Sequence, residues 1–487
     1  MVNTTPVKRF SAISLAVALF VLTAERAVGQ EPPPLDPLVF ANQDELASFY
    51  GRMNVVVGSG ARAFGMGGAF LAQADDATAA SWNPAGLSYL RRKEFSLVGV
   101  HNDFSQRIPR INTAVTPTRY ITTRDQLQGS VADFAAFVYP VRVKGRSGAI
   151  QVSYQRSFSF EGKRTSEATV GKSGFVPNGG LLLDTEFKVD GRGGFDTISV
   201  SSGFEIRSNL RAGVTINRWI NGFSQTVDRP NRDIKSTWDI AGTNFNFGLL
   251  FAPVPKLNLG AVLKTQFSAD LELTKTRTDS IPRPADPDTG IVPEPEEIEN
   301  TLSGKALIRF PRVYGFGLSY RATNTITLSA DFTRTEWSKA TITDFFSLVA
   351  GGVLRYGTLP FPAVQEGASG QANTNQVRAG AEWVLRLGDS GHVLVPLRAG
   401  VFRDGQPVVK RLRAGVGAEI FEYKPAFTGL TAGAGVTVGG VLFDVAFIRE
   451  YGKVPISRSG DDIYDANTSI KYNRLFASMM FRFGQRR

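Results

Sequence analysis

The stretch that decides the fold lies near the N-terminus and reads GSGARAFGMGGAFLAQADDATAASWNPAGLSYL (residues 58–90). It holds five glycines between positions 58 and 68, and no apolar period in it is long enough for one regular element. Asp76 and Asn83 are residue types that cap helices, and Pro84 suits a first helical turn, so we expect two short helices here. Short helices joined by glycines cannot bury a core of their own. The stretch must therefore pack inside a larger structure, and we interpret it as a plug.

The sequence that follows has the pattern of such a surrounding structure. From residue 93 onward, apolar and polar residues alternate in segments of about ten, the length that a tilted strand needs to cross a bilayer. The alternation predicts fourteen strands, centred on residues 93–104, 131–143, 147–160, 194–206, 209–220, 237–252, 257–272, 312–321, 325–337, 376–387, 392–403, 428–438, 441–449 and 472–483.

The connections between these segments alternate in length. Short ones lie at residues 144–146, 207–208, 253–256, 322–324, 388–391 and 439–440; long ones lie at 105–130, 161–193, 221–236, 273–311, 338–375, 404–427 and 450–471. Bacterial outer-membrane barrels combine short periplasmic turns with long external loops and an even strand number. The predicted fold class is all-β, a transmembrane antiparallel β-barrel of about 14 strands with an N-terminal plug in its lumen. Soluble sandwiches and propellers do not require this asymmetry of loops.

The cost of placing charge in lipid predicts which side chains face outward. A charge near the bilayer midplane costs about 1–4 kcal/mol, so Asp331 and Asp444 must face the lumen. Their apolar neighbours then face the lipid, namely Ile326, Leu328, Ala330 and Phe332 on one strand and Val441, Phe443, Val445 and Phe447 on another. The last strand carries Leu475, Ala477, Met479, Phe481 and Phe483 on one face, which resembles the signal read by the barrel assembly machinery.

The N-terminus has the pattern of an export signal. Lys8 and Arg9 precede an apolar run over residues 10–22, and residues 27–29 offer a small-residue cleavage site. We therefore divide the chain into a signal peptide (1–29), a strap and plug (30–92) and a barrel (93–487). An exported barrel of this kind belongs in the outer membrane of a Gram-negative bacterium.

Composition argues against enzyme chemistry and nucleic-acid binding. Cysteine is absent and only two histidines occur, His101 and His392, far apart in the predicted topology, so we expect no metal site, no cofactor and no catalytic residues. The formal net charge of +11 is explained better by contacts with outer-membrane lipid and lipopolysaccharide phosphates than by nucleic acid, which an exported protein seldom meets. Lumen carboxylates such as Asp331 and Asp444 are ordinary in barrels.

Two separated motifs resemble the FadL/TodX family of outer-membrane transporters for hydrophobic compounds. The plug matches its N-terminal hatch at residues 62–63, 68–69, 75–77 and 83–87, and a second match runs over residues 310–320, 328–332 and 336–339, where it ends in Trp337-Ser338. The resemblance implies a monomeric barrel that passes lipophilic molecules by diffusion. The hatch residues that it singles out are Arg62, Gly67, Gly68, Asp75, Asp76, Asn83 and Pro84. The hatch motif is also similar to that of PorV-type barrels, which act as partners of a secretion system.

Two functions therefore stay open. One is a channel for passive uptake of long-chain fatty acids or aromatic hydrocarbons, and the other is a PorV-like barrel that binds a protein partner. The connection over residues 338–375 is unusually apolar for an external loop, and we expect a substrate groove or mutual loop packing at Phe345, Phe346, Leu348 and Val349.

Pro140 is a candidate for a lateral exit. Proline gives no N–H to a strand ladder, and every strand of a closed barrel is paired on both sides. Pro140 must therefore sit at a bulge, at a missing bond or at the end of its strand. Either it begins the turn at residues 144–146, or the barrel wall opens beside it.

Overall fold

The computed structural model of the chain describes residues 58–112, 119–170, 187–229, 232–281, 283, 288–289, 291–349, 352–360, 370–387, 393–413, 420–455 and 467–484. The expected signal peptide and strap, residues 1–57, lie outside these ranges.

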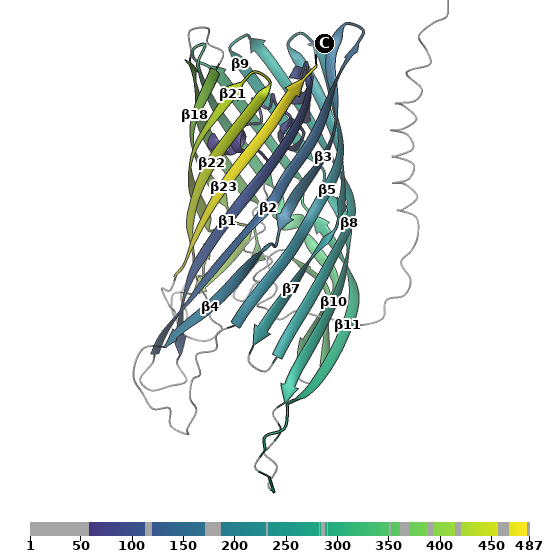
Figure 1. The fold of residues 1–487 in the computed structure, drawn as a ribbon, viewed down its shortest axis with the longest axis vertical. Helices are drawn as coiled ribbons and strands as arrows, with labels where there is room; N and C mark the ends of the chain where they lie inside the picture. The colour runs from purple at the N-terminus through teal and green to yellow at the C-terminus, as the bar shows by residue number, and fades with distance from the viewer. Residues whose placement is uncertain are drawn as a thin grey trace, which may run out of the picture. The chain divides into compact units, whose positions relative to one another are not determined.

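Fourteen strands form a closed antiparallel ring (Figure 1). In ring order they are β1 (Lys93–Asn112), β2 (Arg119–Val143), β3 (Arg146–Ser159), β5 (Phe187–Arg207), β6 (Leu210–Ile220), β8 (Arg232–Val254), β9 (Leu257–Lys264), β12 (Val313–Arg321), β13 (Ile326–Thr335), β17 (Thr374–Leu387), β18 (Val393–Gly405), β21 (Ala426–Val438), β22 (Val441–Pro455) and β23 (Asn467–Phe483). Each pairs with the next, and β23 pairs with β1. The fourteen predicted strands are confirmed, and closure leaves no open edge in the membrane.

The two ends of the ring differ. Short turns join the strands at one end, for example at Lys144-Gly145 and Gly439-Gly440, and we call this the turn end. At the other end, the hairpin end, six more strands extend the wall: β4 (Gly162–Val170), β7 (Gly222–Arg229), β10 (Phe267–Ile281), β11 (Glu296–Phe310), β14 (Thr341–Val349) and β15 (Gly352–Pro360). A separate small sheet holds β16 (Gly370–Gln371), β19 (Val408–Arg413) and β20 (Ile420–Tyr423).

These extensions correct the expectation of long loops. Large parts of residues 105–130, 161–193, 221–236, 273–311 and 338–375 are strands. The alternation of inward and outward side chains continues there, but the outward positions become polar, as at Thr274 of β10 and Lys305 of β11, which are exposed. Strand pairing therefore continues beyond the apolar band that marks the membrane. A sequence criterion based on hydrophobicity consequently places the strand ends too close to the membrane.

Side chains face the sides that the cost argument predicts. Leu328 and Phe332 of β13 are exposed on the outer wall, whereas Asp331 between them is buried inside. On β22, Val441, Phe443, Val445 and Phe447 are exposed and Asp444 is buried. The described part of the chain contains no helix with the length and apolarity needed to cross a membrane.

Residues 58–92, which we call the hatch, lie inside the ring (Figure 1). The hatch contains α3 (Ala61–Gly65), α4 (Ala79–Trp82) and the 3₁₀ helix η2 (Pro84–Tyr89); a further 3₁₀ turn, η3 (Trp337–Lys339), separates β13 from β14. Helix α3 contacts β18, β21, β22 and β23, and η2 contacts β3, β5, β6 and β8 on the other side of the ring. The hatch therefore touches the wall on both sides.

Glycines of the wall make room for the hatch backbone. A Cβ atom on Gly400 of β18 would lie 2.3 Å from the Gly67 nitrogen, and one on Gly213 of β6 would lie 2.3 Å from the Pro84 carbonyl carbon. Gly67 and Gly68 themselves have φ values of +70° and +75°, which favour glycine. Close backbone approach is thus built into both partners.

The outward face yields a test of the membrane boundary. Val445→Lys places a charge in the middle of the apolar band of β22 and should lower the free energy of unfolding by about 2–4 kcal/mol, because the charge must leave water. Val438→Lys, at an exposed position beside the turn end, should cost about 0–1 kcal/mol. Urea unfolding in lipid vesicles measures both; equal costs would contradict the assigned band.

Candidate functional site

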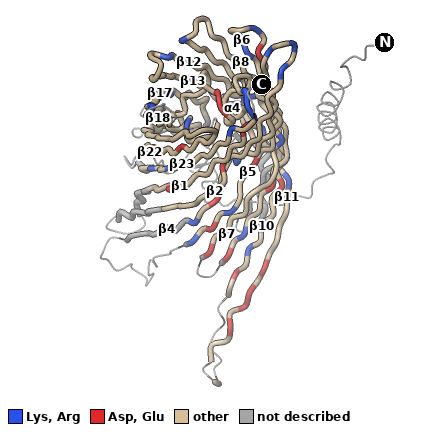
Figure 2. The backbone as a smooth tube through the Cα atoms, turned by 45° about the horizontal axis from the view of Figure 1, so that its top comes forward, with Lys and Arg blue, Asp and Glu red and all other residues tan. Residues whose placement is uncertain are grey.

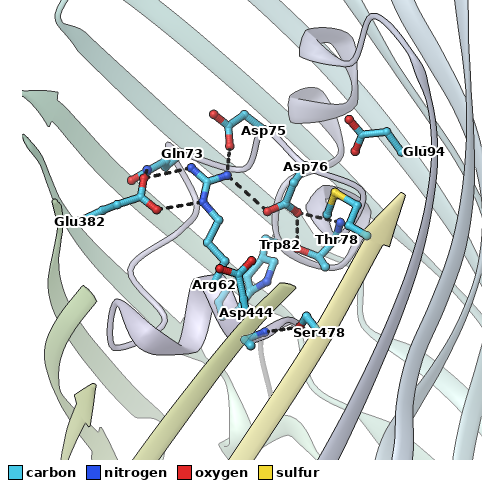
Figure 3. A network of polar contacts seen from close by, with 12 residues as sticks. Arg62, Gln73, Asp75, Asp76, Thr78, Trp82, Glu94, Glu382, Asp444 and Ser478 are labelled. Carbon is cyan, nitrogen blue, oxygen red and sulfur yellow. Dashed lines mark hydrogen bonds and ion pairs between the residues drawn. The ribbon is translucent and has the colours of Figure 1, made fainter. Parts of the chain in front are cut away.

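Arg62 is the centre of an ionic network that ties the hatch to the wall (Figure 3). Its Nη1 lies 2.5 Å from Asp75 Oδ1 and 3.4 Å from Asp76 Oδ2, both in the hatch. Its Nε and Nη2 each lie 3.2 Å from an oxygen of Glu382 on β17. Although burial alone would lower the pKa of Arg62, the charges of Asp75, Glu382 and Asp76 raise it well above its usual range. The guanidinium therefore stays charged and holds both hatch carboxylates.

The network continues along the inner face of the barrel wall. Glu382 accepts a 2.7 Å bond from Nε of Arg398 on β18, and Nη1 of Arg398 reaches Asp444 on β22 at 2.6 Å. Gln73 of the hatch also donates to Glu382 at 3.2 Å and accepts a bond from Ser329 at 2.9 Å. One connected set of side chains thus spans the hatch and several strands.

Wall side chains also bond to the hatch backbone. Asp331 Oδ2 accepts from the N–H groups of Phe70 and Leu71 at 2.7 and 2.8 Å. Thr431 accepts from Gly67 N and donates to Gly65 O, each at 2.9 Å. Further bonds of this kind join Ser478 to Ala61, Arg378 to Gly67, Gln151 to Ala77 and Lys264 to Ser81, while Asp133 accepts from the Ser59 hydroxyl.

Asn83 fixes the start of η2. Its Oδ1 accepts from Ala85 N at 3.2 Å, and its Nδ2 donates to Leu71 O at 2.9 Å and to Leu249 O of β8 at 3.0 Å. Pro84 occupies the first helical turn, where its missing N–H costs nothing. Asn83 therefore caps a helix and links the hatch to the wall at once.

Asp76 does not cap α4, and our expectation for it is wrong. The cap position is Thr78. Asp76 Oδ1 accepts bonds from the Thr78 backbone N–H at 2.8 Å and from the Thr78 hydroxyl at 2.6 Å, which is an Asx turn in front of the helix. Its second oxygen then remains available to Arg62.

A cavity of about 100 Å³ lies against the hatch on its hairpin-end side. Ala80 and Ser81 of α4 contribute to its lining. Polar side chains of the wall form another part, including Ser153, Ser157, Thr197, Ser199, Thr215, Asn217, Asn244 and Asn246. A third part is aromatic: Phe134, Phe158, Trp219, Phe267, Phe310 and Trp337. Gln155, Lys264, Thr265, Pro311 and Val313 complete the lining.

The aromatic part of the cavity is a set of nearly parallel rings. Trp219 stacks on Phe310 at 5.3 Å between ring centroids and on Phe267 at 5.2 Å, and Phe267 stacks on Phe310 at 4.8 Å with an interplanar angle of 8°. Trp219 Nε1 donates to Asn244 at 2.8 Å, so the one polar atom of this ring is satisfied. The cavity thus offers flat apolar surface next to amide and hydroxyl groups.

A second, wider space lies on the turn-end side of the hatch. Its volume is about 940 Å³, and we call it the vestibule. Hatch residues Arg62, Gln73 and Asp75 and wall residues Glu382, Arg398 and Asp444 line it. The hatch and its ionic network therefore separate the cavity from the vestibule.

Other predicted site residues are not brought together with the hatch. Phe345, Phe346, Leu348 and Val349 belong to β14, whose register pairs Phe345 with Tyr356 and Phe346 with Arg355 of β15. They form a hairpin rather than a loop; their side-chain surroundings lie outside the described part. The groove assigned to them stays a prediction.

Pro140 lies near the turn end of β2. It pairs in register with Ala149 of β3, whereas the β1–β2 ladder ends at the pair Glu94–Val138, before Pro140 is reached. Pro140 is buried on the inner side. The lateral exit beside it stays a prediction.

Sequence reasoning missed several residues of the site. Glu382 and Arg398 complete the network, and the aromatic rings of the cavity come from β2, β3, β6, β10, β11 and the 3₁₀ turn η3. The sequence did contain a sign of this network. Arg378 and Glu382 lie four residues apart on β17, so both side chains point to the same, inward side. Because an unpaired buried charge is costly, both side chains need partners in the lumen. Among the described residues, no cluster of potential metal ligands occurs, and His101 is exposed on β1, bonded to Ser130.

These features define a closed membrane β-barrel whose lumen is blocked by a bonded hatch. The same fold occurs in a Pseudomonas aeruginosa FadL homologue (TM-score 0.56, 15% identity, covering 88% of this chain and 99% of that one). It occurs in the Ralstonia pickettii toluene transporter TbuX (0.52, 16%, 88% and 100%) and in the monoaromatic hydrocarbon channel CymD (0.51, 15%, 89% and 100%). A family model described as BamG matches residues 182–349, and no curated protein sequence matches the chain. The resemblance to FadL/TodX proteins is thus confirmed at the level of the fold.

The network predicts that the hatch loosens when Arg62 loses its charge. Removing one partner of a buried ion pair costs about 3–5 kcal/mol, and the 43% exposure of the Asp75 side chain puts this case at the low end. Arg62→Gln should therefore raise the basal conductance of the protein in planar bilayers. Arg283→Gln, which breaks an exposed ion pair with Glu296, is the matched control and should leave conductance unchanged. Equal conductance of all three proteins would mean that the network does not hold the hatch closed.

Proposed function

We propose that the protein is an outer-membrane channel for the passive uptake of hydrophobic compounds. The observation on which the proposal rests is the cavity beside the hatch, which is lined by stacked aromatic rings and by Ala80 and Ser81 of α4. Only the hatch separates a molecule bound there from the vestibule. The likeness in fold to a toluene transporter and a monoaromatic hydrocarbon channel supports this choice of cargo.

The shape of the barrel supports an orientation. Short turns of bacterial outer-membrane barrels face the periplasm and the longer connections face outward. The turn end would then be periplasmic, so that cargo enters from the hairpin end and meets the cavity before the hatch. The apolar residues of β14 are proposed to collect it, and the wall near Pro140 is proposed as its exit.

The cavity volume favours small cargo. An engineered protein cavity of about 150 Å³ binds benzene. The present cavity of about 100 Å³ would therefore admit at most a single small ring without rearrangement. Aromatic hydrocarbons fit this limit better than long-chain fatty acids, which are larger than the cavity.

A second candidate is a barrel that binds a protein partner, as PorV-type barrels do. The surface proposed for such a partner is formed by β10, β11 and β14, which lie within the residues that match the BamG model. Figure 1 shows β10 and β11 running past the ends of their neighbours.

Filling the cavity tests the proposed function. Ser157→Trp puts a large ring into the cavity beside Phe158 and should lower uptake of labelled toluene severalfold in cells that express the protein, because the bound position is taken. Ser202→Trp is the matched control, since Ser202 pairs with Ile150 on the lipid-facing side of β5. Surface expression is measured for both variants. Uptake that is equal in the two variants and in the parent protein would rule out this cavity as the route.

A further inference from the structure

The vestibule is unusually basic. Eight of its lining residues carry a positive charge: Arg62, Arg91, Arg92, Arg142, Lys256, Arg321, Arg398 and Arg482. Four carry a negative charge: Asp75, Glu94, Glu382 and Asp444. The lining therefore has twice as many cations as anions.

Each of these four carboxylates forms an ion pair within the protein. Asp75 is paired with Arg62, Glu94 with Arg482, Asp444 with Arg398, and Glu382 with both Arg62 and Arg398. Arg91 lies 3.6 Å from Glu205. Within the described part of the chain, Arg92, Arg142, Lys256 and Arg321 have no ion-pair partner.

The surplus cations lie on opposite sides of the mouth. Arg92 precedes β1 and Arg142 is near the end of β2, which neighbours β1 in the ring. Across the ring, Lys256 lies in the turn between β8 and β9 and Arg321 ends β12; Arg321 N donates to Lys256 O at 2.8 Å. A single small anion cannot reach both sides, whereas an extended chain with several carboxylates can.

The concave shape strengthens this attraction. Charges of one sign around a cup with a protein floor concentrate the field in the opening and raise the local concentration of the opposite charge. Figure 2 shows that Lys and Arg also gather along the turns at this end of the barrel. Several of these, including Lys144, Arg207 and Arg386, are exposed and do not line the vestibule.

We propose that the vestibule is a docking site for an acidic segment of a partner protein, held by Arg142, Lys256, Arg321 and Arg92. The site is separate from the cavity on the other side of the hatch. Only its assignment to the periplasm rests on the orientation given under the proposed function; binding itself does not depend on the cargo.

The test uses the full-length mature protein in nanodiscs of zwitterionic lipid and a fluorescein-labelled peptide of alternating glutamate and serine. Fluorescence anisotropy should show binding that weakens as salt is added, and a peptide with lysine in place of glutamate should not bind. The triple variant Arg142→Glu, Lys256→Glu and Arg321→Glu should weaken binding by about tenfold or more.

A matched triple variant separates the vestibule from general surface charge. Lys144→Glu, Arg207→Glu and Arg386→Glu changes the net charge by the same amount at the same end of the barrel, and it should retain most of the affinity. Equal losses in the two triple variants, or no binding by the parent protein, would overturn the proposal. So would competition by free glutamate as effective as that of the peptide at equal carboxylate concentration, since that result describes a site for a small anion. Toluene uptake, measured separately, tests the cavity and not this site.

Discussion

The hatch depends on hydrogen bonds that it cannot make by itself. Its helices are five, four and six residues long, and helices of that length leave almost all of their N–H and C=O groups without an internal partner. Inside a barrel these groups cannot all turn to water, so the wall has to provide partners. Ser478, Thr431 and Lys264 do so from three different strands, by bonds to Ala61 N, Gly65 O and Ser81 O. Polar residues of the lumen thus serve the fold of the hatch as much as any route through it.

The lumen is divided into two chemically different sides. Strands β17, β18, β22 and β23 present charged side chains that pair with each other and with Arg62, as Arg474 does with Glu450. The opposite strands present the stacked aromatic rings and amides of the cavity. The ion pairs of Arg62 therefore anchor the hatch on one side. The apolar surface that suits a hydrophobic cargo lies on the other, together with Lys264, which lines the cavity and donates to Ser81 O. The hatch touches both sides, which places it between anchor and cargo.

The fold was predictable from the sequence because lipid imposes a simple rule on every strand. Asp331 and Asp444 could be placed inside from their cost alone, and the alternation around them fixed the outward residues. The rule loses its force beyond the bilayer, which is why β11 and β14 were expected to be loops. The hatch residues could be named from their motif, but Asp76 was given the wrong bond, because local pattern does not tell an Asx turn from a helix cap. Glu382 and Phe310 were missed, since their roles arise only when distant strands close into a ring.

The central claim is that the hatch must move to let cargo pass from the cavity toward the vestibule. The chain has no cysteine, so a cysteine pair introduced at Ala80 of the hatch and Thr215 of β6, where the threonine hydroxyl donates to the alanine carbonyl oxygen at 3.4 Å, provides the only thiols of the variant. The measurement is toluene uptake by cells expressing this variant, before and after reduction. The account predicts that uptake falls when the disulfide forms and returns when it is reduced. Full uptake through the locked protein would contradict it.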